Sequence, residues 1–189
     1  MTTDYIPEEM FQKLLDCLMP ENALVLRLMM DTGMRISDAL SIRKSALFGA
    51  AKAGTMYEYT YMEQKTGKER IARIPPDLAA DLQRSTAPSV WLFPGRDPSR
   101  HRTRQAVWKD LHRTAKLWRV NGQKLRRNLG THSARKIYAV KLYHEQEELG
   151  LYDPLHYVQV DMNHKDMAVT FLYAMADVIS DRRRQKKAS

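Results

Sequence analysis

The sequence has few of the features that mark secreted, disulfide-bonded or membrane-spanning proteins. Its single cysteine, Cys17, excludes an internal disulfide and a zinc site built from cysteines. No apolar run reaches the roughly 20 residues that span a bilayer, and residues 1–4 do not resemble a signal peptide. No low-complexity linker or internal repeat divides the 189 residues. We therefore expect one soluble domain with its own core, located in the cytoplasm.

Acidic residues are scarce in only one part of the chain. The net charge is +9, but residues 1–95 sum to −1 and residues 142–189 to −2. Between them, residues 96–141 carry 14 basic side chains against Asp97 and Asp110, a local charge of +12. So concentrated an excess indicates a polyanionic partner, most often nucleic acid. A solvated basic surface is the alternative.

The hydrophobic pattern predicts an α+β fold, mostly helical with a small antiparallel three-stranded edge sheet. Tyrosines alternate along a strand at residues 56–63, and its partner at residues 69–74 follows a hairpin tip. A short strand near residues 46–48 would complete the sheet. Residues 91–95 are predicted as an apolar strand or plug. We expect helices at residues 6–19, 21–32, 36–40, 77–84, 103–119, 131–148, within 152–162 and after Asp166.

Two basic side chains lie where the local structure would hold them in place. Arg35 follows the Thr-Gly-Met sequence of residues 32–34, at the joint between two predicted helices. Lys65 lies in the predicted hairpin tip, which also contains Lys68. Taken singly, such a residue is ordinarily a surface side chain in a salt bridge or in solvent.

A third basic stretch begins the long helix predicted for residues 131–148. His132 and Arg135 are three residues apart, so their side chains share one face of its first turn. Together with the free N–H groups of a helix N-terminus, such a pair can bind a phosphate. An isolated His-x-x-Arg pair is more often structural or solvated.

The last stretch, residues 164–173, combines a histidine with a tyrosine. Asp166 is a suitable N-cap for a short helix. Tyr173 falls on the polar side of that helix, so we expect its hydroxyl to face outward. His164 precedes the cap, and a bend there can bring its imidazole toward the same side. The apolar arc of the helix contains Met167, Ala168, Phe171, Leu172, Met175 and Ile179.

Together, and in this chain order, the four stretches resemble the catalytic domain of the tyrosine recombinases, the phage integrase family. Residues 32–40 (TGMRISDAL) are similar to its first arginine box and residues 131–136 (THSARK) to its second. Residues 163–173 are similar to its third box, with the family's spacing of histidine and tyrosine. The family usually has glycine where this chain has Asn163, but asparagine also adopts the left-handed conformation.

The resemblance implies a site-specific DNA recombinase or integrase of a mobile element that uses no metal, ATP or other cofactor. Tyr173 would attack a DNA phosphodiester, giving a 3′-phosphotyrosyl bond and a free 5′-hydroxyl. Arg35 and Arg135 would clamp the non-bridging oxygens, and His164 would add a hydrogen bond. A 5′-hydroxyl of a second strand would then reverse the reaction.

Two further residues would move protons in this reaction. His132 would assist deprotonation of the phenol, and Lys65 would protonate the leaving oxygen, with Lys68 as the alternative lysine. A metal site built from His132 and His164 is the competing interpretation. No acidic residue stands three or four positions after His132, which argues against it.

Double-stranded DNA is the expected partner, without a membrane. A homo-oligomer, a tetramer on DNA, is expected to assemble through the C-terminal segment. The backbone phosphates around the cleavage site would contact basic residues of the +12 segment. The candidates for this contact are Arg102, Arg104, Lys109, Arg113, Arg126, Arg127 and Lys136.

The resemblance divides the chain into a catalytic domain at residues 1–180 and a basic tail at residues 181–189, expected to be disordered in isolation. The helical core-binding domain that usually precedes this catalytic domain is expected to be absent. Two rival functions therefore stay open. One is a DNA-binding fragment or regulator that is inactive in strand exchange alone. The other is an enzyme similar to type IB topoisomerases, which nicks and religates one duplex.

Overall fold

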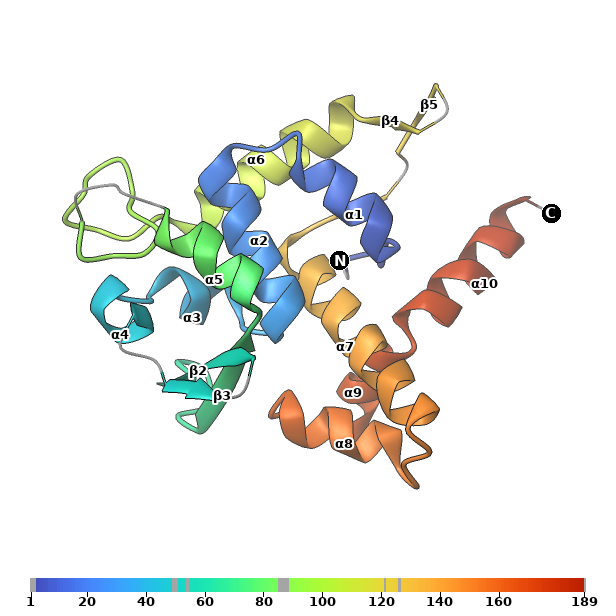
Figure 1. The fold of residues 1–189 in the computed structure, drawn as a ribbon. Helices are drawn as coiled ribbons and strands as arrows, with labels where there is room; N and C mark the ends of the chain where they lie inside the picture. The colour runs from blue at the N-terminus through green and yellow to red at the C-terminus, as the bar shows by residue number, and fades with distance from the viewer. Residues whose placement is uncertain are drawn as a thin grey trace.

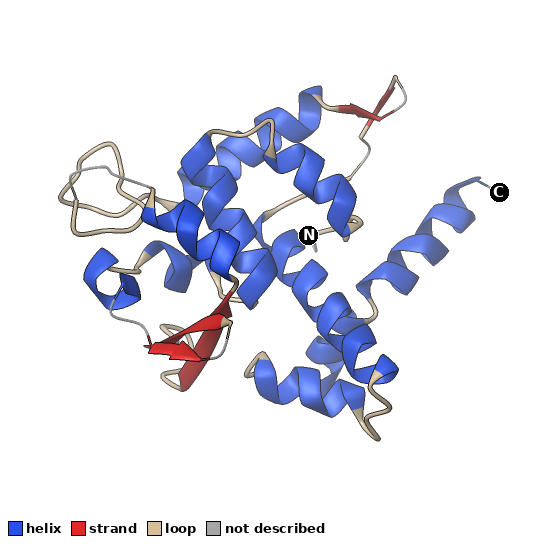
Figure 2. Cartoon of the chain, in the orientation of Figure 1, coloured by secondary structure: helices blue, strands red, loops and turns tan. Residues whose placement is uncertain are grey.

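A computed structural model describes residues 3–48, 51–53, 55–84, 89–120, 122–125 and 127–188 (Figure 1). Helices predominate, as Figure 2 shows, which confirms the predicted α+β class. In the described ranges, no helix combines the length and apolar character needed to cross a membrane. The helices are α1 (Glu8–Leu15), α2 (Pro20–Thr32), α3 (Ile36–Leu40), α4 (Lys44–Phe48), α5 (Pro76–Gln83), α6 (Arg104–Leu117), α7 (Thr131–Glu148), α8 (Pro154–Asp161), α9 (Met167–Ala174) and α10 (Ala176–Ala188). The strands are β1 (Ala51–Ala53), β2 (Met56–Met62), β3 (Glu69–Ile74), β4 (Arg119–Val120) and β5 (Gln123–Lys124).

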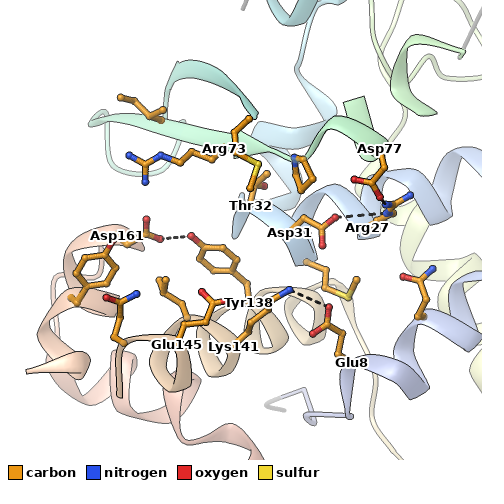
Figure 3. Close-up of a pocket in the computed structure, with 18 residues that line it drawn as sticks. Glu8, Arg27, Asp31, Thr32, Arg73, Asp77, Tyr138, Lys141, Glu145 and Asp161 are labelled. Carbon is orange, nitrogen blue, oxygen red and sulfur yellow. Dashed lines mark hydrogen bonds and ion pairs between the residues drawn. The ribbon is translucent and has the colours of Figure 1, made fainter. Parts of the chain in front are cut away.

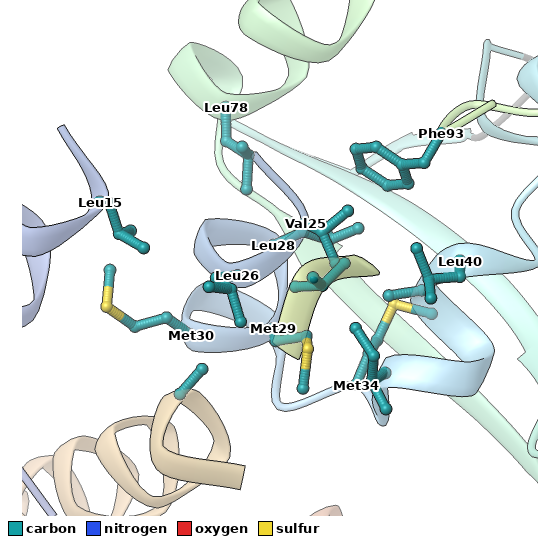
Figure 4. Close-up of a cluster of buried hydrophobic side chains, with 14 of the residues drawn as sticks. Leu15, Val25, Leu26, Leu28, Met29, Met30, Met34, Leu40, Leu78 and Phe93 are labelled. Atoms are coloured by element: carbon teal, nitrogen blue, oxygen red, sulfur yellow. The ribbon is translucent and has the colours of Figure 1, made fainter. Parts of the chain in front are cut away.

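Helix α2 lies at the centre of the core. Its side chains Val25, Leu26 and Leu28 are fully buried (Figure 4). It packs against α7 on one side and against α3, α5 and β3 on the others. Phe93, from the predicted plug, is also fully buried, and burial of each such side chain stabilises the fold by roughly 1.5–3 kcal/mol. Because α3 and α7 both pack on α2, the two arginine-bearing segments are brought close together.

The sheet has two longer strands, β2 and β3, joined by a hairpin, and the three-residue β1 pairs with β2 in antiparallel fashion. The prediction of a strand at residues 46–48 is wrong, because these residues belong to α4. The backbone N–H groups of Ala46 and Leu47 both donate to the carbonyl of Arg43, which closes a helical turn. The first strand instead follows at Ala51–Ala53.

Helices α7, α8 and α9 enclose a second, smaller core, and this packing corrects the predicted orientation of α9. The buried side chains of α9 are Thr170 and Ala174, and Tyr173 packs beside them. The apolar arc faces solvent instead, with Phe171 and Leu172 each 49% exposed. Small side chains at the contact allow α9 to approach α7 and α8 closely. Tyr173 therefore faces inward, and the prediction of an outward hydroxyl is wrong.

The basic tail, predicted to be disordered in isolation, is part of α10, which continues to Ala188 and projects away from the body of the domain (Figure 1). Its first turns are held by the buried Ala176 and by Ser180, whose hydroxyl accepts a hydrogen bond from Arg127 at 2.6 Å. Basic residues in the last turns of a helix also interact favourably with its dipole. A helix that is already anchored can therefore extend through this sequence.

A cleft of about 530 Å³ lies between α1, α2, α7, α8 and β3, lined by charged side chains of both signs (Figure 3). Asp31 lies in its wall, 3.7 Å from the guanidinium Nε of Arg27. Burial raises the pKa of the Asp31 carboxyl to about 6, although Arg27 and Lys141 act in the opposite direction. A carboxylate that is charged at neutral pH in this position therefore destabilises the folded state.

We predict that Asp31→Asn stabilises the protein at pH 8 by on the order of 1–3 kcal/mol. The folded-state pKa lies above the unfolded value of 3.8, so the native carboxylate costs stability as pH rises from 4 through 6. Denaturant unfolding at pH 4 and pH 8 measures this difference. The free energy of unfolding of the variant should exceed that of the parent at pH 8 and equal it at pH 4. An equal change at both pH values would contradict the assignment, and exposed Asp16→Asn is the control.

Candidate active site

Two predicted arginines converge on the turn that ends α2. Arg35 is the residue before α3, and its guanidinium forms an ion pair with the carboxylate of Glu63, the residue after β2. Arg135 is the fifth residue of α7, is 2% exposed, and donates a hydrogen bond to the carbonyl oxygen of Gly33. Segments 100 residues apart in the chain thus place two guanidinium groups at one point.

Gly33 makes this convergence possible. It ends α2 in the left-handed conformation, with φ of 64°, which L side chains rarely adopt. A Cβ atom there would lie 2.4 Å from the ring of Tyr138 on α7. Glycine therefore lets α7 approach the turn closely and leaves the Gly33 carbonyl pointing at the guanidinium of Arg135.

The site has an excess of positive charge. Burial, together with the neighbouring Arg70 and Arg35, lowers the pKa of the Arg135 guanidinium to about 10, so it remains protonated at pH 7. Glu63 is the buried carboxylate between Arg35 and Arg70. Clustered guanidinium groups of this kind bind phosphate oxygens through charge-assisted hydrogen bonds.

His164 and Tyr173 lie together beside the arginines. Asn163 has φ of 52°, and this left-handed residue produces the predicted bend between α8 and α9. The imidazole and phenol rings lie edge to face with centroids 5.1 Å apart, and Nδ1 of His164 is 3.2 Å from the hydroxyl oxygen of Thr170. The Asp166 side chain accepts a hydrogen bond from the N–H of Ala168, which confirms the predicted N-cap.

Burial and the arginines set the protonation states of these two rings. Burial, then Arg135 and Arg35, lower the pKa of His164 to about 4, so its imidazole is neutral at pH 7. Burial raises the pKa of the Tyr173 phenol, and the positive charges of Arg135 and Arg35 partly offset that increase. A neutral phenol in this position needs a base before its oxygen can attack.

His132 and Lys65 stand on the exposed side of the cluster. Partial burial, followed by the charges of Arg135 and Arg104, lowers the pKa of His132, and Lys65 adds to the effect. A neutral imidazole can accept a proton. Lys65 is exposed at the tip of the β2–β3 hairpin, and Lys68 is exposed on the same hairpin. The hairpin therefore brings the charge of Lys65 close enough to lower the pKa of His132.

Three of the predicted DNA-binding residues serve contacts within the domain. Arg102 donates to the side-chain oxygen of Asn22 on α2 at 3.1 Å. Arg127 donates to the carbonyl of Tyr5 at 2.7 Å as well as to Ser180. Lys136 donates to the carbonyl of Thr3 at 2.6 Å, and its ammonium lies 5.9 Å from the ring centroid of Tyr173. Arg126 lies outside the described residues.

The other three candidates, Arg104, Lys109 and Arg113, are exposed on α6. Arg113 also pairs with Asp110 at 2.6 Å. Sequence reasoning missed Trp108 on the same helix, which is 46% exposed and lies against the imidazole of His112 with ring centroids 4.0 Å apart. An exposed aromatic ring among cations is typical of nucleic-acid-binding surfaces.

Two buried charged residues of the site were also missed, Glu63 and Arg70. Arg70 faces inward on β3 with Ala72 and Ile74, so the alternating pattern of that strand contained the signal of a charged residue on a buried face. For metals, the described ranges contain no group of three His, Cys, Asp or Glu side chains arranged to hold an ion.

The chain matches one protein family by sequence, and its fold is similar to that of several solved structures. The model of the phage integrase family matches residues 4–178. The XerH site-specific recombinase bound to its difH substrate aligns with a TM-score of 0.67 and 19% identity, over 89% of this chain and 49% of that one. A lambda integrase dimer bound to a COC′ core site aligns with a TM-score of 0.65 and 14% identity, over 92% and 49% of the two chains. No curated protein sequence matches significantly.

The Tn1549 transposon integrase in complex with a circular intermediate DNA also has this fold, with a TM-score of 0.65 and 13% identity over 92% of this chain and 62% of that one. The chain thus spans about half to two thirds of the length of these recombinases. The family match covers nearly the whole chain and agrees with the motif resemblance. The chain therefore belongs to the phage integrase family, the tyrosine recombinases.

Proposed function

We propose that the chain is the catalytic part of a site-specific DNA recombinase or integrase that breaks and rejoins DNA through a tyrosine. The observation that carries this proposal is the convergence of Arg35, Arg135, His164 and Tyr173 from three separate segments. Solved family members bound to a recombination substrate, a core site and a circular intermediate DNA support DNA as the partner.

In the proposed first step, the Tyr173 oxygen attacks the scissile phosphorus and the bond to the 5′-oxygen breaks. His132, neutral at pH 7, accepts the phenol proton directly or through water, and Lys65 donates a proton to the leaving 5′-oxygen. The step exchanges one phosphodiester for another, so its balance requires neither ATP nor a metal ion. A 5′-hydroxyl from the same or another strand reverses it.

The arginines act on the charge that develops during this step. Arg35 and Arg135 would each donate to a non-bridging oxygen, and the neutral imidazole of His164 would donate one more hydrogen bond. Loss of one such donor typically costs about 3–4 kcal/mol of transition-state stabilisation. In the absence of DNA, Glu63 and the Gly33 carbonyl hold the two guanidinium groups.

Assembly on DNA is proposed to use the C-terminal segment. Phe171 and Leu172 on α9 and Val178 on α10 leave an apolar surface exposed in a single copy. A surface of this kind on a domain that must act at paired sites favours contact with a second copy of the chain. The rival functions differ in their DNA products, because a topoisomerase-like enzyme would relax supercoils without joining two sites.

We predict that Tyr173→Phe abolishes a covalent DNA adduct while leaving DNA affinity unchanged, because only the attacking hydroxyl is removed. A nicked suicide substrate should trap the parent as a denaturation-resistant band on a gel. Tyr152→Phe is the matched control, since Tyr152 is fully exposed on the loop before α8. An adduct that persists in Tyr173→Phe would assign the nucleophile to another residue.

A second prediction concerns the exposed face of α6. DNA affinity should fall by about 0.9 log units per log unit of salt for each phosphate contacted. Replacing both Arg104 and Lys109 by Gln should flatten this slope by about one to two units on any sequence. Arg84→Gln, an exposed arginine after α5, should leave the slope unchanged. If the double variant has the same salt dependence as the parent, α6 does not contact the DNA phosphates.

A third prediction concerns assembly. Val178→Asp should leave adduct formation at a single site within about twofold, because Val178 is 42% exposed and has no assigned role in the cleavage step. Exchange between two sites should be lost, because a charge would be buried at the contact between copies. Product analysis with one-site and two-site substrates measures both. Normal strand exchange by the variant would show that this surface is not the contact between copies.

A further inference from the structure

We infer that Arg70 is a positioning residue on which both phosphate-binding arginines depend; this inference rests on the proposed function of the same site. The proposed chemistry assigns Arg70 no contact with Tyr173 or with the phosphate. Arg70 lies on β3 and is 6% exposed. Its register partner on β2 is Tyr61, whose hydroxyl is 3.4 Å from Nη1 of Arg70.

The guanidinium of Arg70 fixes the turn that holds Arg135. Its Nη1 donates to the carbonyl of Gly33 at 3.0 Å, and its Nη2 donates to the carbonyl of Thr32 at 3.1 Å. The Gly33 carbonyl is the oxygen that also accepts from Arg135. One backbone oxygen therefore joins the two guanidinium groups, and the direction of that oxygen depends on both of them.

The same guanidinium reaches Arg35 through Glu63. The Glu63 carboxylate is fully buried, pairs with Arg35, and lies 3.9 Å from Nη1 of Arg70. With Arg70 in place, the carboxylate is shared between two cations rather than held by Arg35 alone. Its charge therefore holds Arg35 less strongly than a single pair would, which leaves Arg35 available to a phosphate.

Glu63 extends this arrangement to the hairpin tip. Its second oxygen accepts a hydrogen bond from the hydroxyl of Thr66 at 2.7 Å, next to Lys65. The N–H of Gln64 donates to the carboxylate of Asp38 on α3 at 3.0 Å. The hairpin that carries Lys65 is thus fastened to the segment that carries Arg35.

Arg70 is also anchored by α8. Its Nη2 lies 2.9 Å from the carboxylate of Asp161, and the same carboxylate accepts a hydrogen bond from the hydroxyl of Tyr138 at 2.8 Å. Figure 3 shows Asp161 and Tyr138 pointing toward one another across the wall of the cleft. Arg70 therefore connects the α2 turn, the hairpin and α8.

Only an arginine can make this set of contacts. A guanidinium donates in a planar fork to several acceptors at once, whereas a lysine ammonium is a compact point charge on a flexible chain. Lysine at this position would keep the buried positive charge but would leave the Gly33 or Thr32 carbonyl, or a carboxylate, without its donor. The two phosphate-binding arginines would then lose their fixed separation.

The test is Arg70→Lys, with the single-turnover rate of covalent adduct formation measured on two suicide substrates. One carries the natural scissile phosphate, and the other carries an uncharged methylphosphonate there. On the phosphate, the rate at saturating DNA should fall by about 10-fold or more with DNA affinity within about twofold. On the methylphosphonate, which has one oxygen fewer for the arginines to hold, the loss should be clearly smaller.

Arg27→Lys is the matched control, because Arg27 is a partly buried arginine that pairs with Asp77 and Asp81 on the far side of α2. It should lower the unfolding temperature without changing the ratio of the two rates. Asp161→Asn is the second variant if Arg70→Lys does not fold. It retains the guanidinium, removes one anchor, and should produce a smaller loss with the same substrate dependence.

Equal losses on both substrates, or a parental rate in Arg70→Lys, would overturn the positioning role. These outcomes require that the parent forms the Tyr173 adduct. If the parent forms no adduct on either substrate, the proposed function fails first. If the parent forms the adduct and Arg70→Lys forms it at the same rate, the positioning role of Arg70 is rejected while the proposed function stands.

Discussion

The left-handed turn at Gly33 is the constraint on which the site depends. It ends α2 and directs one carbonyl oxygen at two guanidinium groups, those of Arg70 and Arg135. The absence of a side chain lets Tyr138 of α7 approach the turn to a distance that any Cβ atom would prevent. The contact between α2 and α7 is therefore both the main packing of the core and the support of the active-site geometry.

Buried charge in this domain is tolerated because it is organised around that turn. Arg70 and Glu63 are almost inaccessible to solvent, and such groups are costly unless they are paired and hydrogen-bonded. Their partners are backbone carbonyls and oppositely charged side chains from separate segments. The cost is offset by contacts that also hold Arg35 and Arg135, so one set of interactions stabilises the fold and positions these two guanidinium groups.

The packing of α9 shows how function and burial can compete. The helix turns its small and polar side chains inward, which brings Tyr173 beside His164 and under the influence of the arginines. The consequence is that the apolar side chains of Phe171 and Leu172 are left exposed to solvent. The exposed face and the inward tyrosine are thus two results of one orientation.

The sequence by itself determined most of the helices, the hairpin, the bend at Asn163 and the boxes that contain Arg35, His132, Arg135, His164 and Tyr173, because local patterns and spacing specify these features. It predicted a strand where α4 lies and disorder where α10 continues. It did not determine which face of α9 is buried, since a short helix takes its orientation from its neighbours. Nor did it separate the arginines that face solvent from those used inside the domain, because charge is visible in a sequence and its partner is not. The roles of Glu63 and Arg70 depend on contacts between β2, β3, α2 and α8, and only the tertiary structure brings those segments together.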